Sequence, residues 1–158
     1  MIDLDEKRPT WDEYFFNLVN AVAKRATCDR GKTACIIVKD KQILATGYVG
    51  SSPGEKHCDE VGHLMKTVIH EDGSKSDHCF RTIHAEQNAI CQAARQGIAL
   101  EGATMYCKMS PCRSCAMMIV RCGIKEVKCL KKYKSDGVDI LKNAGVDVYF
   151  ADESVEEY

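Results

Sequence analysis

The sequence lacks three features that would place the protein in other functional classes. It has no apolar run near the ~20 residues that a membrane-spanning helix needs, and its acidic start, Met1–Glu6, lacks the apolar stretch of a secretory signal. The net charge of −1 offers no basic field, which argues against polymeric nucleic acid as the main partner. It also lacks internal repeats and low-complexity segments. We therefore expect a cytoplasmic protein whose partners include neither a membrane nor a nucleic-acid polymer.

Length and composition indicate one domain with a proper core. The chain has 158 residues, of which 45% are apolar and 28% charged, so we expect a single domain over 1–158 with its core at about 10–150. Ten cysteines are many for a protein without a secretory signal. In a reducing compartment such thiols serve as metal ligands or core packing. Core packing is expected for four of them, namely Cys35, Cys91, Cys107 and Cys129.

The hydrophobic pattern alternates between strand-like and helix-like segments after an initial helix. Thr10 and Glu13 form a capping box that starts a helix reaching about residue 26. The expected strands are 35–39, 42–48, 103–108, 126–131 and 146–150, and the later helices are 84–97, 111–122 and 136–144. Alternating strands and helices imply parallel pairing and right-handed crossovers. The predicted fold is therefore α/β: a three-layer α/β/α domain with a five-stranded mixed sheet.

Two segments do not follow the alternation. From Val49 to Arg81 the pattern dissolves into a long irregular loop, for which we expect one helical turn near Leu64–Ile69. Long irregular loops in compact domains are usually functional or disordered, and the His and Cys residues of this one favour function. The acidic tail from Asp152 to Tyr158 is expected to be a frayed, solvated end.

A His-x-Glu motif and a Pro-Cys-x-x-Cys motif carry the chemistry. His84 stands two residues before Glu86, and Cys112 and Cys115 have the spacing that lets both thiols reach one ion from a first helical turn. One imidazole and two thiolates leave the fourth tetrahedral position of a zinc ion open, as in catalytic sites. We expect Ser110 to cap this helix, whose positive end favours thiolates. The alternative is a zinc knuckle or a pair of buried core cysteines.

Glu86 has the chemistry of a proton carrier beside such a zinc ion. Zinc lowers the pKa of bound water to roughly 7, while a departing amine needs a proton delivered to it. The carboxylate of Glu86 can take the first proton and supply the second, which makes it the candidate catalytic acid and base. This pair of motifs is the signature of zinc nucleobase deaminases.

With these residues placed, the chain resembles the deoxycytidylate (dCMP) deaminases of the bacterial and phage type, within the cytidine deaminase superfamily. The segments that carry the resemblance follow the family's order: Cys28-Asp29-Arg30, Gly47-Tyr48-x-Gly50-Ser51, His57-Cys58-Asp59-Glu60, Arg81–Ile90 and Gly102–Tyr106. The resemblance spans about residues 11–150 and implies a cytidine deaminase-like fold. It further implies zinc-dependent deamination of dCMP to dUMP for thymidylate synthesis. It also implies a homo-oligomer, often a hexamer, with dCTP and dTTP as allosteric effectors.

The resemblance also suggests which residues contact the nucleotide. Phosphate contacts are expected at Arg30, Tyr133 and Lys134, with His57 as a further candidate; for each basic residue alone, and for Lys134 in particular, the alternative is a solvated surface charge. The family usually has Asn where this chain has Val49, and an apolar side chain cannot make the hydrogen bonds of an amide. Either Ser51 substitutes for it or the substrate differs. The Lys32-Thr33-Ala34 stretch also departs from the family's small Val-Gly-Ala run.

Three further cysteines and a histidine surround the irregular loop. Cys28, Cys58 and Cys79, with His63 or, less favourably, His57, are candidates for a second, closed zinc site. Some phage and bacterial members of the resembled family carry an extra metal in this region. Four metal bonds would fix a long loop that has few apolar side chains. The alternative is that these are ordinary buried thiols, because no tight Cys-x-x-Cys spacing supports the cluster.

Other functions remain open at the level of the sequence. The same zinc motif serves deaminases of other free cytosine or purine nucleosides and nucleotides, and tRNA-editing adenosine deaminases, although the latter would need a basic surface. A catalytically silent zinc protein that senses nucleotides is a third alternative. The presence of Glu86 argues against it, since a sensor has no use for a proton carrier.

Overall fold

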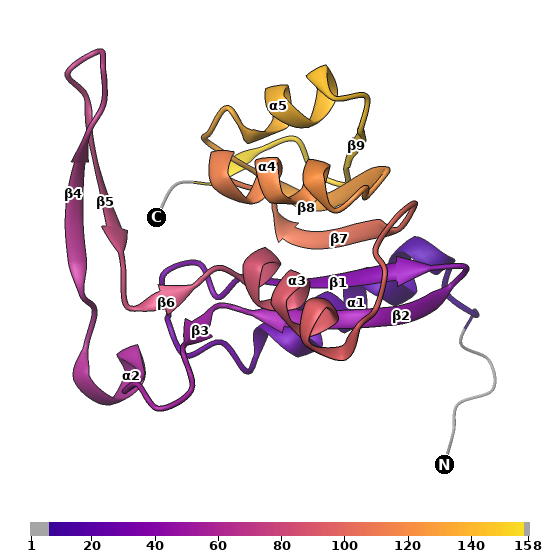
Figure 1. The fold of residues 1–158 in the computed structure, drawn as a ribbon, viewed down its shortest axis with the longest axis horizontal. Helices are drawn as coiled ribbons and strands as arrows, with labels where there is room; N and C mark the ends of the chain where they lie inside the picture. Colours follow the sequence, from indigo (N-terminus) through magenta and orange to yellow (C-terminus); the bar gives the residue numbers. More distant parts are fainter. Residues whose placement is uncertain (1–6, 157–158) are drawn as a thin grey trace.

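A mixed β-sheet forms the middle of the fold in the computed structural model, which describes residues 7–156 (Figure 1). The strands lie side by side in the order β2, β1, β7, β8, β9. β1 pairs antiparallel with β2 and β7, whereas β7, β8 and β9 are mutually parallel. Their bounds are β1 Ala34–Lys39, β2 Gln42–Tyr48, β7 Thr104–Met109, β8 Glu126–Tyr133 and β9 Asp147–Phe150. The predicted five-stranded mixed sheet is confirmed.

Helices cover both faces of this sheet and complete the predicted three layers (Figure 1). α1 (Trp11–Ala23) lies on one face, where Phe15 and Val19 pack with Ile36 of β1. The other face carries three helices: α3 Ala85–Gln96, α4 Arg113–Arg121 and α5 Gly137–Asn143. Their side chains join those of the central strands in the larger of the two cores. The predicted α/β/α architecture is therefore also confirmed.

Most predicted boundaries hold because local capping decides them. Thr10 and Glu13 form the expected capping box at the start of α1. α3 ends at Gly97, which takes the left-handed conformation with φ 68° that glycine adopts without strain. The predicted cap of α4 is wrong, because the helix begins after Cys112 and not after Ser110. The Ser110 hydroxyl instead accepts a hydrogen bond from the N–H of Tyr133 at 2.8 Å, which ties β7 to the end of β8.

The segment 49–81 is more regular than the sequence suggested. After β3 (Gly50–Ser51) and the single helical turn α2 (Cys58–Val61), β4 (Met65–Ile69) and β5 (Lys75–Cys79) pair as a long antiparallel hairpin. We call this hairpin, residues 65–79, the arm; Figure 1 shows it projecting from the body. The predicted helical turn at 64–69 is wrong: its β-branched residues form β4. The polar 70–74 turn joins the strands, and β6 (Thr82–Ile83) leads back to the body.

Three smaller expectations need comment. Cys35, Cys107 and Cys129 are buried side by side in the sheet as expected, but Cys91 is exposed on α3. The tail is less frayed than predicted, because β10 (Val155–Glu156) pairs parallel with the end of β8. Residues 157–158, like the start 1–6, lie outside the described part. Among the helices within residues 7–156, none has the length and apolar character needed to cross a membrane.

Candidate metal centre and active site

Two helix starts bring His84, Cys112 and Cys115 together, and we call these residues the first cluster. The Nδ1 atom of His84 lies 3.4 Å from the sulfur of Cys112 and 3.4 Å from that of Cys115. In a tetrahedral zinc site with ordinary Zn–N and Zn–S bonds, nitrogen and sulfur ligands stand about 3.6 Å apart. The donor atoms therefore fit a zinc ion, and the three residues leave one tetrahedral position for another ligand.

The fold places the first cluster at one end of the sheet, where β2 and β7 both finish. His84 is the N-cap of α3 and Cys112 the N-cap of α4. α3 comes so close to β2 that a Cβ on Gly47 would lie 2.2 Å from the carbonyl oxygen of Ala85. Only glycine fits there, because the obstructing atom belongs to the backbone. The close approach of α3 to β2 thus fixes the position of the start of α3, where His84 lies.

The electrostatics of the two thiols favour one thiolate even without a metal. A hydrogen bond from Cys115 lowers the pKa of Cys112 to about 3 against the opposing effect of burial. The same interaction raises the pKa of Cys115, whose thiol keeps the shared proton. The hydrogen bond to Cys112 also raises the pKa of His84 above its ordinary value. The cluster can therefore hold anionic sulfur at neutral pH, the form that binds soft cations.

Glu86 lies in the first turn of α3, two residues after His84, and its side chain is only 7% exposed. Burial raises the pKa of this carboxyl above its ordinary value. A carboxyl with a raised pKa exchanges protons more readily near neutral pH than a solvated one does. The position predicted from the His-x-Glu motif is thus buried beside the two thiols and suited to proton transfer.

A cavity of about 640 Å³ opens over the first cluster. Glu86, His84 and Cys112 line its floor, and Arg30, Val49 and Tyr133 of the predicted nucleotide contacts line it as well. Three further predicted contacts, Ser51, His57 and Lys134, are not part of its lining.

Two of the predicted contacts that lie outside the cavity lining, His57 and Ser51, each have a buried polar atom. His57 caps α2, and its Nδ1 is buried, as is the Ser51 hydroxyl; neither atom has a hydrogen-bond partner among the described residues. Val49 is 7% exposed and packs against Cys28 and Cys58. Cys28 and Cys79 of this second group of thiols line the cavity beside Val49. Ser51 does not take the place of the family's Asn in the cavity.

Sequence reasoning missed the cavity wall that the arm supplies. Val68, Asp77, His78 and Phe80 line the cavity, together with Gln87 of α3. Neither β4 nor β5 carries a strand signal strong enough to predict their pairing, because their residues are mostly polar or exposed. The three consecutive β-branched residues Thr67, Val68 and Ile69 were a hint of a strand.

The predicted second group of ligands also comes together, and we call Cys28, Cys58, His63 and Cys79 the second cluster. Their donor atoms all lie within 4.8 Å of one another. Cys28 and the Nδ1 of His63 are 3.5 Å apart, and the sulfurs of Cys58 and Cys79 are 3.6 Å apart. These separations again suit tetrahedral zinc, in which two sulfurs stand about 3.8 Å apart. His57, the less favoured candidate, is not a member.

The surroundings of the second cluster match those of a metal site. The Nε2 of His63 lies 2.9 Å from a carboxylate oxygen of Asp29, the contact that commonly orients a metal-binding imidazole. Burial opposes ionisation of Cys79, but hydrogen bonds from the backbone at Arg81 and Leu64 lower its pKa to about 6. Cys79 is therefore a thiolate at neutral pH. With four donors, this cluster leaves no open tetrahedral position.

Known proteins share both the sequence and the fold. The family model of the cytidine and deoxycytidylate deaminase zinc-binding region matches residues 9–131. ComE operon protein 2 of Bacillus subtilis (strain 168) is 38% identical over 144 residues, 90% of this chain and 71% of that protein. The deoxycytidylate deaminase of Mycobacterium phage D29 is 34% identical over 122 residues, 76% of this chain and 94% of the phage protein. The dCMP deaminase of cyanophage S-TIM5, crystallised with dCMP and dUMP, matches with a TM-score of 0.74 and 30% identity over 92% of this chain and 99% of that one.

Fold and site together define a hydrolytic deaminase with a zinc-binding region. The chain belongs to the cytidine and deoxycytidylate deaminase family. The enzyme class and the zinc cofactor expected from the two motifs are thereby confirmed.

Proposed function

We propose that the protein hydrolyses the exocyclic amine of dCMP and releases dUMP and ammonia. The observation that carries this proposal is the convergence of His84, Cys112 and Cys115 beside the buried Glu86, at a cavity of about 640 Å³ that His84, Cys112 and Glu86 line. The likeness to a phage dCMP deaminase that was crystallised with dCMP and dUMP supports the same substrate.

The first cluster holds the catalytic zinc in this proposal. His84 contributes its Nδ1 and the two cysteines their sulfurs, and the N-cap positions of α3 and α4 keep these atoms in place. A zinc ion bound there supplies an activated water at neutral pH. The protein's own part is to leave one position open and to surround it with a walled cavity.

Glu86 moves the protons of the reaction. Its carboxylate accepts one proton from the attacking water and delivers it to the ring nitrogen of cytosine. It then takes the remaining proton from the hydroxyl now bonded to the ring carbon and gives it to the leaving amine, so that the carbonyl of uracil forms as the carbon–nitrogen bond breaks. The raised pKa caused by burial helps each transfer, because the carboxyl releases and regains a proton at little cost near neutral pH. Deep burial also keeps bulk water from competing for the proton.

The nucleotide's phosphate end lies toward Arg30 and Tyr133. Both residues line the cavity with Glu86, and the backbone of Tyr133 is held by the Ser110 hydroxyl. A guanidinium at this position can form charge-assisted hydrogen bonds with a 5′-phosphate. Val49 offers only an apolar surface to the nucleoside, so hydrogen bonds to the sugar must come from other residues.

Ammonia release from a panel of substrates tests the proposal. Purified protein is assayed with dCMP, deoxycytidine, CMP, and adenosine and its monophosphate. We expect dCMP to be preferred over deoxycytidine by ~10³ in kcat/KM, because two or three charge-assisted hydrogen bonds to the phosphate are worth about 1.5–3 kcal/mol each. Equal efficiency on the two cytosine compounds would contradict the phosphate assignment. Turnover confined to adenosine compounds would assign the site to another deaminase reaction.

We also infer that the second cluster holds a zinc ion of structural kind. Four protein donors at tetrahedral separations, one of them oriented by Asp29, support this inference. Elemental analysis of protein purified without chelator should give two zinc ions per chain. Cys58→Ser should give one, and Cys91→Ser, a change at an exposed thiol outside both clusters, should still give two. One zinc per chain in all three proteins would eliminate the second site.

Several expectations stay predictions. These are the organisation of residues 1–158 as one domain, regulation by dCTP and dTTP, assembly as a hexamer, a role in thymidylate synthesis and a cytoplasmic location. Lys134 and His57 also remain candidates without support from the cavity lining.

A further inference from the structure

The arm is a two-stranded hairpin that needs support from outside its own strands. β4 and β5 pair over five residues each, and Figure 1 shows them standing away from the sheet. An isolated hairpin of this kind is marginally stable in water. The arm also exposes large apolar side chains, with Ile69 68% exposed and Phe80, just beyond its end, 54% exposed. Its position relative to the body must therefore be fixed where the two strands leave the body.

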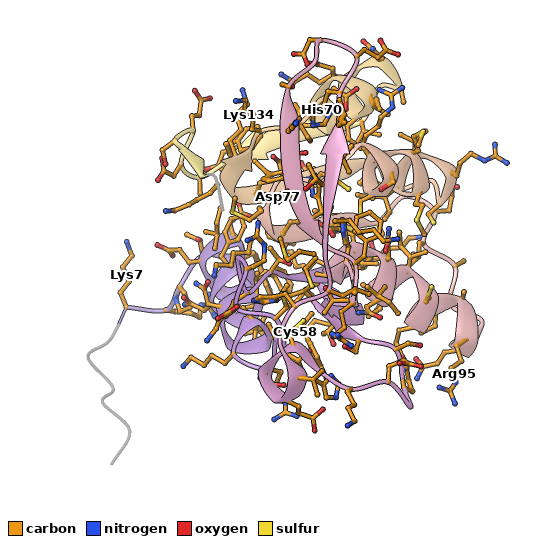
Figure 2. All side chains as sticks on the ribbon, turned by 90° about the vertical axis from the view of Figure 1, so that its left-hand side faces the viewer. Lys7, Cys58, His70, Asp77, Arg95 and Lys134 are labelled. Carbon is orange, nitrogen blue, oxygen red and sulfur yellow. The ribbon has the colours of Figure 1, made fainter. Side chains whose placement is uncertain are left out.

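The second cluster lies at that point. His63 lies two residues before β4, Cys79 is the last residue of β5, and Cys79 pairs with Met65 across the hairpin. The other two donors belong to the body side: Cys58 starts α2 and Cys28 follows α1. Figure 2, which looks onto the arm, shows Cys58 below its foot and His70 toward its tip. A metal ion held by this cluster therefore joins both strands of the arm to the body.

Three consecutive residues of one body loop hold the arm. Cys28 is a donor of the second cluster, and Asp29 contacts the imidazole of His63 at 2.9 Å. The guanidinium of Arg30 donates a hydrogen bond to the carbonyl oxygen of Asp77, in the middle of the arm, at 3.1 Å. The same Arg30 lines the cavity. The loop thus connects the second cluster, the arm and the nucleotide cavity within three residues.

The inner side of the arm completes the cavity above the first cluster. Val68 of β4 and Asp77 and His78 of β5 line the same cavity as Glu86. The hydroxyl of Ser76 contacts the imidazole of His78 at 2.7 Å, which restricts that ring. A displacement of the arm would therefore open a wall of the cavity while leaving the floor in place.

We propose that the second cluster positions the arm as a wall of the nucleotide cavity, so that Cys58, His63 and Cys79 are positioning residues that set substrate affinity. The inference rests on the proposed function, since it assigns the cavity to a nucleotide and a metal to this cluster. If loss of the metal leaves the arm in place about a tenth of the time, the apparent affinity falls about tenfold. The floor is unchanged, so kcat per catalytic zinc stays within about threefold.

Two variants of the second cluster and one matched control test this. Cys58→Ser removes a buried donor, His63→Gln removes a solvent-accessible one and serves if the first variant folds poorly, and Cys91→Ser is the control. For each protein we would measure zinc per chain, kcat and KM for dCMP, and amide hydrogen exchange over residues 65–79. Both cluster variants should lose one zinc, raise KM about tenfold at near-constant kcat, and lose exchange protection in the arm. The control should match wild type in all three.

The readouts separate this proposal from the proposed function. A variant that loses one zinc yet keeps the wild-type KM and the wild-type exchange pattern overturns the positioning role. A wild-type protein that carries a single zinc, in the first cluster, overturns it too. If wild type does not turn over dCMP, the proposed function fails, and the positioning role is then decided by exchange in the arm alone. In that case, faster exchange on loss of the zinc supports it and unchanged exchange overturns it.

Discussion

Replacing Glu86 with glutamine separates proton transfer from metal binding. The change keeps the size of the side chain and removes only its ability to accept and return a proton. The change leaves the three donor atoms of the first cluster in place, with the Nδ1 of His84 3.4 Å from each cysteine sulfur. The variant should therefore bind zinc and substrate as wild type does. General acid and base catalysis contributes roughly 10²–10⁴ in rate, so kcat should fall by at least about a hundredfold.

The magnitude follows from the number of transfers that Glu86 performs. A hundredfold loss corresponds to about 2.7 kcal/mol of activation free energy, and a ten-thousandfold loss to about 5.4 kcal/mol. Because the residue is buried and serves more than one transfer, we expect a loss toward the upper end. Steady-state ammonia release and elemental zinc analysis are the assays, with Glu55→Gln in an exposed loop as the matched control. A Glu86→Gln protein that retains zinc and most of its rate would refute the reasoning.

Three further perturbations test the nucleotide site, the helix packing and the surface electrostatics. Arg30→Ala removes both a charge-assisted phosphate contact and the hydrogen bond to the arm at Asp77, so it should lower kcat/KM for dCMP by about 10-fold to 100-fold more than for deoxycytidine; equal losses on both substrates would contradict a phosphate contact. Gly47→Ala should destabilise the fold by about 1–3 kcal/mol in a denaturant titration and reduce bound zinc, because its Cβ meets the backbone of Ala85 at 2.2 Å. Partial burial raises the pKa of the Asp12 carboxyl, but hydrogen bonds from Tyr106 and Lys128 outweigh this effect and lower the pKa below its unfolded value. The stabilising effect of the Asp12 carboxylate is therefore present above about pH 4 and is lost as the pH falls through the lowered pKa, so Asp12→Asn should destabilise the protein at pH 6 and progressively less at lower pH.

The sheet and its helices were predictable because their signals are local and repeated. The Thr10 capping box, the alternation of strands and helices after His84, and the glycines after the helices each mark a boundary that the structure keeps. The exact start of α4 was not predictable. Ser110 has a side chain suited to capping, but its hydroxyl is used by the backbone of Tyr133, a contact between residues 23 positions apart. Such long-range competition leaves no trace in a local pattern.

The site was predictable to the extent that chemistry constrains residue types. Imidazole and thiol donors are rare enough that the two clusters could be named before their geometry was known, and the structure brings each set within 4.8 Å. The cavity wall was not predictable, because Asp77 and His78 reach the cavity only through the pairing of the arm. Likewise, Ser51 and His57 follow the cavity-lining Val49 closely in sequence but are not part of the cavity lining. Sequence proximity does not determine which side of a strand or turn faces a cavity.

Zinc titration of metal-stripped protein, followed by the conversion of dCMP to dUMP, tests the central claim most directly. We expect the stripped protein to be inactive, and turnover to return in proportion to the zinc that occupies the cluster of His84, Cys112 and Cys115. A His84→Ala protein should remain inactive over the same range of zinc. Full conversion of dCMP by the stripped protein, or no conversion by a protein whose first cluster is filled with zinc, would contradict the account.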